Sequence, residues 1–168
     1  LADDSRFMGN VSHRVFQYAL TRPEADVTLL DQPALEKLYS EAVDYILQTE
    51  GMLLLEKGKE DRVQSLYHAI KEKFLALVKH ISENNWVVEG CEAHKEAVRS
   101  GLRLQGYADI LLSHKKKGPK EYAIIDLKWQ SGKYYSSLMN EDRDLQLALY
   151  STLFNDLGGF SPTAYFII

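Results

Sequence analysis

Apolar side chains recur at helical spacing in the first half of the chain. Residues 12–20 place apolar positions on one face and end just before Pro23, which predicts a short helix. Residues 33–49 repeat the pattern, and the repeat is strongest over residues 61–84. Such stripes are typical of core-facing helices. We therefore expect three helices in this half.

The pattern changes after residue 85, where β-branched and aromatic residues take over. Residues 86–91 predict a short strand, and residues 102–112 alternate between apolar and polar positions for longer. Residues 113–120, which contain a glycine and a proline, indicate a loop. Residues 122–129 then predict the partner strand. The sequence therefore predicts a β-hairpin in the second half of the chain.

A last helix over residues 144–154 and a strand beginning near Thr163 complete the expected elements. Helices followed by a hairpin, a helix and a strand suit an α/β sandwich with a mixed sheet. At 168 residues, the length is typical of one domain. We expect a single domain over residues 1–168, with residues 31–85 as a helical segment within it. Because the chain starts at Leu1 and stops inside an apolar run, we expect it to be excised from a longer protein.

Composition narrows the class of protein. The chain is 45% apolar and 26% charged, as expected for a globular domain. Its net charge of -4 provides no global attraction for a polyanion, so any nucleic-acid contact must be local. The candidate cations are listed in chain order: Lys115, Lys116, Lys117, Lys120, Lys128, Lys133 and Arg143. For the lysine run at 115–120 alone, a solvated loop is the preferred interpretation.

A single cysteine, Cys91, excludes an internal disulfide, a zinc ribbon or a four-cysteine iron–sulfur cluster within this chain. A reducing, cytoplasmic setting is expected. The sequence has no run of about 18 apolar residues and no signal-peptide layout at its start, so we expect no membrane association.

Candidate chemistry centres on three residues of the predicted hairpin. Asp126 and Lys128 are two apart on a strand and therefore share a face, and the hairpin can bring Asp109 beside Asp126. Clustered carboxylates repel unless a proton or a cation intervenes, and oxygen-rich sites suit Mg²⁺ or Mn²⁺. Lys128 could then orient a metal-bound water and offset charge on a phosphate. Taken alone, the three residues are better explained by charges that face solvent or pair with each other.

Four short motifs place these residues in a wider pattern. They are, in order, residues 9–13 (GNVSH), 106–109 (GYAD), 126–128 (DLK) and 146–150 (QLALY). Their order and surroundings resemble the RecB-like branch of the PD-(D/E)xK nuclease superfamily. The resemblance implies a restriction-endonuclease-like core, a three-layer sandwich with a central mixed sheet between helices and a helical insertion over residues 31–85. It also implies hydrolysis of DNA.

The resemblance also assigns metal ligands. It implies that His13, Asp109, Asp126 and the backbone carbonyl of Leu127 bind the metal. His13 could equally be an ordinary helix histidine. The lone cysteine does not support the iron–sulfur subtype of this branch.

Further residues are expected around the metal site. The resemblance implies that Gln146 and Tyr150, four apart on a helix, line the active-site cleft beside DNA. Tyr150 could also be a core aromatic. Glu89 corresponds to the acidic residue that often precedes the hairpin, with Glu92 as a rival. Together with Lys133 and Arg143, Gln146 and Tyr150 are the expected DNA contacts.

The function expected on these grounds is a Mg²⁺- or Mn²⁺-dependent deoxyribonuclease, with exonuclease action favoured over endonuclease action. It would act on single-stranded DNA or duplex ends in recombination or repair, with a helicase or other domains as partners. A catalytically idle module of the same fold that binds nucleic acid or docks a subunit is the alternative. A metal hydrolase acting on small phosphate esters is the third possibility.

Overall fold

The computed structural model describes residues 4–22, 26–50, 60–99, 101–116, 118–129, 132–141, 144–155 and 160–168. Its contacts divide the chain into two compact units. The helical unit comprises residues 1–84 with Ile168, and the strand unit comprises residues 85–167. The prediction of one domain over residues 1–168 stays a prediction.

Within the described residues of the helical unit, the structure shows three α-helices and one short 3₁₀ helix. They are α1 (Asp4–Leu20), η1 (Val27–Leu29), α2 (Gln32–Thr49) and α3 (Glu60–Glu83). Asp31 caps α2 by accepting a hydrogen bond from the amide of Ala34, and Pro33 follows in the first turn. The three predicted helices are therefore confirmed.

The start of α1 differs from the prediction. The helix begins at Asp4, so Ser12 lies inside it. The Ser12 hydroxyl is buried and donates to the Met8 carbonyl oxygen over 2.7 Å. A serine that returns its hydrogen bond to the preceding turn can remain within a helix. The prediction of a short helix from residue 12 was therefore wrong.

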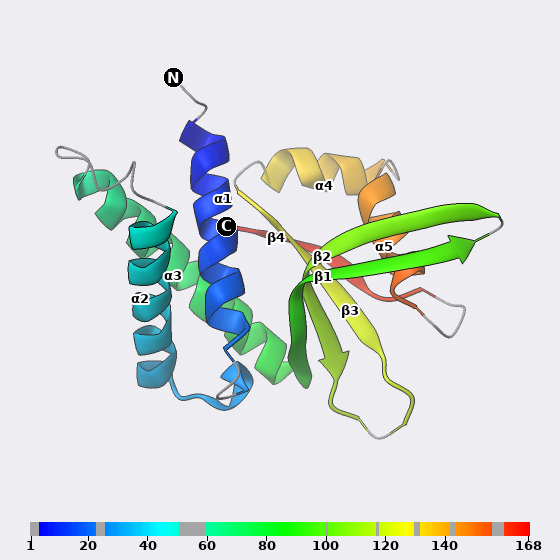
Figure 1. Cartoon of the computed structure of the whole chain (residues 1–168), viewed down its shortest axis with the longest axis horizontal. Coiled ribbons are helices and arrows are strands. Elements are labelled where there is room, and N and C mark those ends of the chain that lie inside the picture. The colour runs from blue at the N-terminus through cyan, green and yellow to red at the C-terminus, as the bar shows by residue number, and fades with distance from the viewer. Residues whose placement is uncertain are drawn as a thin grey trace. The chain divides into compact units, whose positions relative to one another are not determined.

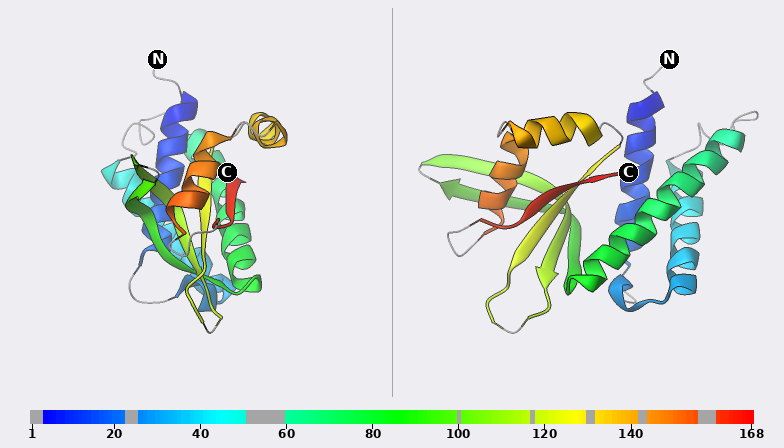
Figure 2. Two further views of the ribbon diagram at one scale, coloured as in Figure 1. Left: turned by 90° about the vertical axis from the view of Figure 1, so that its right-hand side faces the viewer. Right: turned by 180° about the vertical axis from the view of Figure 1, so that it is seen from behind.

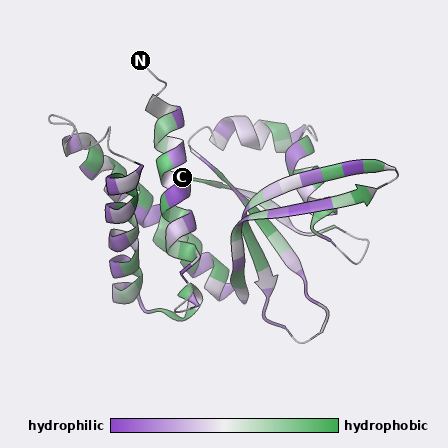
Figure 3. Ribbon diagram, in the orientation of Figure 1, coloured by the Kyte–Doolittle hydropathy of each residue, from purple (hydrophilic) through white to green (hydrophobic). Residues whose placement is uncertain are grey.

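The core of the helical unit forms where the three predicted stripes meet. The rings of Phe16 and Phe74 pack edge to face, 5.6 Å apart. The buried Tyr39 hydroxyl donates to the Tyr67 carbonyl oxygen over 2.8 Å, so it has a partner in the apolar interior. Figure 3 shows hydrophobic and hydrophilic residues alternating around these helices, as expected for amphipathic segments.

The strand unit is built on a four-stranded sheet with the order β1-β2-β3-β4 (Figure 1). The strands are β1 (Trp86–Arg99), β2 (Leu102–His114), β3 (Tyr122–Lys128) and β4 (Thr163–Ile167). The first three are antiparallel neighbours, whereas β4 runs parallel to β3. The sheet is therefore mixed and open, and the predicted α/β class is confirmed at that level.

Strand β1 extends well beyond the predicted 86–91. It pairs with β2 up to Arg99, opposite Leu102, so two residues connect the strands. Gly101 has φ +78, a value that glycine adopts without steric cost and that suits a tight hairpin turn. The Ser-Gly pair at 100–101 was the sequence signal for this hairpin, and the prediction overlooked it.

Two helices lie in the connection between β3 and β4. Helix α4 (Gly132–Asn140) was not predicted, and none of its 9 residues is buried, which explains the lack of a clear apolar stripe. Helix α5 (Leu145–Leu153) was predicted, and Asp144 caps it by accepting from the Leu147 amide over 3.0 Å.

Helix α5 lies on the sheet and completes the core of the strand unit (Figure 2). The buried side chains at its centre are Ala108, Ile124, Leu153 and Phe154. They come from β2, β3 and the end of α5, so the packing fixes the helix against the strands that carry the candidate site. Among the described residues, no helix is both long and apolar enough to cross a membrane.

Candidate functional site

The register of the hairpin brings Asp109 and Asp126 to neighbouring positions. Ile110 pairs with Ile125 at the end of the β2–β3 ladder, and each aspartate is the next residue on its strand. The ladder is then replaced by a side-chain contact, because the Leu127 amide donates to Asp109 Oδ2 over 2.7 Å. Asp109 is thereby fixed beside the backbone that follows Asp126.

Asp126 is the buried centre of the group, with 2% of its surface exposed. Its Oδ1 accepts a hydrogen bond of 2.7 Å from Gln146 Nε2, and its Oδ2 forms an ion pair with Lys128 Nζ. A buried carboxylate is costly unless it is paired and hydrogen-bonded. The lysine and the glutamine together meet that requirement.

Lys128 is held as a cation in this arrangement. Burial lowers the pKa of its ammonium, but the hydrogen bond and charge of Asp126, with the charge of Asp109, outweigh burial and raise the pKa above its ordinary value. Lys128 therefore carries a proton at neutral pH. It can donate hydrogen bonds and neutralise negative charge, but it cannot accept a proton.

The predicted residues Gln146 and Tyr150 both lie on α5, and Gln146 contacts Asp126. They lie one turn apart, and Gln146 Nε2 also lies 3.3 Å from the Tyr150 hydroxyl. Tyr150 packs against the strand-unit core on one side, so its core and cleft interpretations are compatible. Its ring lies directly over Gly106, where a Cβ atom would come within 2.8 Å of Tyr150 Cε1.

Gly106→Ala should therefore displace Tyr150 and weaken the fold. We expect a loss of about 1–3 kcal/mol in the free energy of unfolding, the range for overpacking a filled site, measured by urea denaturation. Gly90→Ala is the matched control, since a Cβ atom at Gly90 would meet nothing within 4 Å. Equal stability of the two variants would contradict the close approach of α5 to β2.

The structure separates the two acidic candidates on β1. Cys91 pairs with Ile110 and Ala93 with Ala108, so Glu92 stands opposite Asp109. A carboxylate oxygen of Glu92 and one of Asp109 lie within 4.8 Å of each other. Glu92 also has φ +49, an uncommon conformation for a non-glycine residue and one that tends to cluster at functional sites. The geometry favours Glu92 over Glu89 as the third acidic residue of the site.

Glu89 has a different set of partners. It accepts from Ser113 Oγ over 2.8 Å and from Lys120 Nζ over 2.5 Å. A register shift between Val88 and Gly90 places it at an irregularity of the β1–β2 ladder. The hydrogen bond from Lys120, and then the one from Ser113, lower the pKa of the Glu89 carboxyl. These contacts tie the β2–β3 loop to β1.

A lowered folded-state pKa stabilises the protein above the ordinary pKa of the group and ceases to do so as the pH falls through the folded value. Glu89→Gln should therefore cost up to about 1 kcal/mol at pH 7, the range for exposed ion pairs. The difference from the parent should shrink below pH 4.5, the ordinary glutamate pKa. Urea denaturation between pH 3 and pH 7 measures it. A difference that does not change with pH would contradict the assignment.

The other predicted residues belong to other parts of the chain. His13 lies on α1 in the helical unit, and its role as a metal ligand stays a prediction. Lys133 is exposed near the start of α4, and Arg143 lies outside the described residues. Lys116 forms an ion pair of 2.5 Å with Glu121 on the loop at 115–121. That loop is therefore not a purely basic surface.

Two tyrosines that sequence reasoning missed lie against Lys128. The centroids of the Tyr135 and Tyr165 rings are 5.6 and 5.5 Å from its Nζ. Tyr165 is paired with Asp126 across the β3–β4 ladder. The parallel pairing of β3 with β4 was the missing information, because it cannot be read from local periodicity.

The donor set suits a hard divalent cation. Asp109, Asp126 and Glu92 provide carboxylate oxygens from three adjacent strands, and such oxygens are the ligands that Mg²⁺ and Mn²⁺ prefer. The close approach of the Glu92 and Asp109 carboxylates also leaves like charges facing each other. A bound cation would relieve that repulsion.

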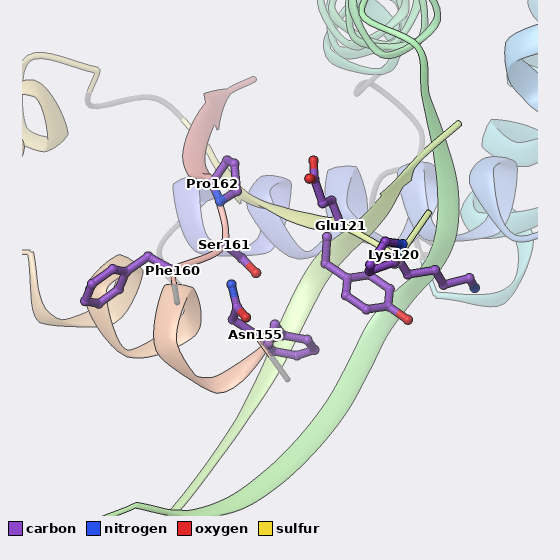
Figure 4. Close-up of a pocket in the computed structure, with 9 residues that line it drawn as sticks. Lys120, Glu121, Asn155, Phe160, Ser161 and Pro162 are labelled. Carbon is purple, nitrogen blue, oxygen red and sulfur yellow. The ribbon is translucent and has the colours of Figure 1, made fainter. Parts of the chain in front are cut away.

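A separate pocket of about 520 Å³ lies near the other end of α5. Phe154, Asn155 and Ser161 line it together with residues of the β2–β3 loop, and none of the predicted site residues does. Figure 4 shows Asn155 and Ser161 near its middle, with Phe160 and Lys120 on opposite sides. The paired carboxylates are therefore the stronger candidate for chemistry.

Comparison with models of known protein families and with curated proteins gives no match to this chain.

Proposed function

We propose that this chain is a Mg²⁺- or Mn²⁺-dependent nuclease that hydrolyses DNA phosphodiester bonds, with the site and the three-layer core of the RecB-like branch of the PD-(D/E)xK superfamily. One observation carries the proposal. The buried Asp126 contacts Lys128 on its own strand and Gln146 from α5, while Asp109 bonds to the next backbone amide. Side chains from three of the four resembling motifs thus meet around Asp126 and Leu127.

Asp109, Asp126, Glu92 and the Leu127 carbonyl would hold the cation. When bound, Mg²⁺ or Mn²⁺ polarises a phosphate and lowers the pKa of coordinated water. Asp126 is kept in place by Gln146, so that the chain provides a preorganised carboxylate instead of a mobile one.

Lys128 provides the positive charge of the mechanism. Because its pKa is raised, it stays protonated and donates hydrogen bonds to the attacking water and to the phosphate oxygens. It thereby offsets the negative charge that develops as the phosphodiester is attacked. A positive group held in place beforehand avoids reorganisation during the reaction.

DNA binding would depend on local contacts, because the net charge of the chain is -4. Lys133 on α4 is exposed, and Gln146 and Tyr150 lie at the carboxylates. We propose exonuclease action on single-stranded DNA or duplex ends, within a larger recombination or repair assembly in which a helicase supplies affinity.

A second candidate function is an idle module of the same fold that binds nucleic acid or a partner. The ion pair between Lys128 and Asp126 favours it, since this contact alone would also satisfy two buried groups structurally. Cleavage of DNA by the purified chain would distinguish the nuclease from the idle module.

The test is incubation of the purified chain with end-labelled single-stranded and duplex DNA, in chelator, Mg²⁺ or Mn²⁺. We expect products only with metal, and a ladder growing from the ends if the action is exonucleolytic. Asp109→Asn should lower the rate by about a hundredfold or more, because loss of even an outer partner of a metal ligand costs about 10- to 100-fold. Glu121→Gln, on the exposed loop, should leave the rate unchanged. Metal-dependent binding without products would favour the idle module.

A further inference from the structure

Two aromatic rings from different elements pack together beside the Lys128 ammonium. Tyr135 is on α4 and Tyr165 is on β4. Their ring centroids are 4.6 Å apart with an interplanar angle of 50°, and both lie within 6 Å of Lys128 Nζ. Only 20% of the Lys128 side chain is exposed. The ammonium is therefore in contact with two rings as well as with Asp126.

Ring faces attract an ammonium within about 6 Å of their centroids, and the attraction grows when the pair is shielded from water. A lysine side chain has four flexible carbons and many rotamers, so the Asp126 contact alone leaves its stem free to move. The pair of rings packed against the ammonium restricts that movement. Their contribution to the position of Nζ is independent of the charge on Asp126.

Tyr165 also faces the start of α5. Burial, and then the nearby Asp144 carboxylate, raise the pKa of Tyr165. Asp144 is the N-cap of α5, the helix that carries Gln146. The Tyr165 side chain thus touches both Lys128 and the residue that begins the helix supporting Asp126.

We propose that Tyr135 and Tyr165 are positioning residues that form a one-sided clamp: their paired rings hold the Lys128 ammonium from one side, while Asp126 binds it, for hydrolysis of the phosphodiester. The proposal rests on the function proposed above. It predicts that, at position 135, loss of the ring lowers kcat, whereas loss of the hydroxyl alone does not. At position 165 the hydroxyl adds the contact with Asp144.

The first test measures stability and does not depend on activity. Tyr135→Leu and Lys128→Met are made singly and together, and the unfolding equilibrium is measured in urea. We expect Tyr135→Leu to lower the folded fraction more in the parent than in the Lys128→Met background, with a coupling factor of about 2 to 30 in the equilibrium constant. Additive effects would overturn the clamp. Met139→Ala, at a residue that is 47% exposed on the same helix, is the control and should show no coupling.

The second test uses the cleavage rate. Tyr135→Leu and Tyr165→Leu should lower kcat by about 2- to 30-fold with KM unchanged, because a displaced ammonium affects the reacting phosphate and not DNA binding. Tyr135→Phe keeps the ring and should restore the parent kcat. A Phe variant as slow as the Leu variant would overturn the proposal. Coupling in urea without cleavage by the parent would refute the nuclease and retain the clamp, whereas cleavage without coupling would refute the clamp alone.

Discussion

Lys128→Met is expected to abolish DNA cleavage and to lower the free energy of unfolding by about 3 kcal/mol. Removal of one member of a buried ion pair costs about 3–5 kcal/mol, because the remaining charge has no counter-ion. Asp126 is that remaining charge, with only 2% of its surface exposed. The partial exposure of Lys128 places the expected loss at the lower end of the range. Cleavage of end-labelled DNA and urea denaturation measure the two effects.

A double variant separates the structural role of Lys128 from the catalytic one. Asp126→Asn with Lys128→Met removes both charges, and the amide oxygen of the introduced asparagine side chain could still accept from Gln146. We expect most of the lost stability to return while cleavage stays absent. Lys116→Met is the matched control: its ion pair is about half exposed, so its loss should cost no more than about 1 kcal/mol. Cleavage at the parent rate by Lys128→Met would refute the proposed role of the ammonium.

Mn²⁺ should raise the melting temperature of the parent, and Asp109→Asn should largely remove this response. A ligand present at 100 times its dissociation constant stabilises the folded state by about 2.7 kcal/mol. Without metal, the Asp109→Asn variant should melt at or above the parent temperature, because it removes one of two like charges that lie within 4.8 Å. The amide oxygen of the introduced asparagine can still accept from the Leu127 amide. Thermal unfolding in chelator and in Mn²⁺ measures both effects.

Glu89→Gln is the control for the metal response, because Glu89 is paired with Lys120 and Ser113. It should respond to Mn²⁺ as the parent does. A destabilised Asp109→Asn, combined with a parent midpoint that Mn²⁺ does not change, would contradict a metal site. Asp109 would then be a structural acceptor for the Leu127 amide and nothing more.

The two acidic residues of β1 show why the site could not be completed from the sequence. Glu89 and Glu92 are three positions apart, so a regular strand would place them on opposite faces. Which of them stands beside Asp109 depends on the register shift at Val88–Gly90 and on the backbone conformation of Glu92. A shift of one residue reverses the face of every following side chain. Strand alternation alone therefore left both candidates open.

The sequence by itself determined most of the elements and the local pairs of site residues. Asp126 with Lys128 and Gln146 with Tyr150 share a face because of the strand and helix periods, which depend only on spacing along the chain. The tertiary structure alone decided the contacts between elements: the approach of Tyr150 to Gly106 and the packing of Tyr135 and Tyr165 beside Lys128. These contacts follow from strand order, register and the docking of α4 and α5. Periodicity specifies which face a residue occupies, but it does not specify what that face meets.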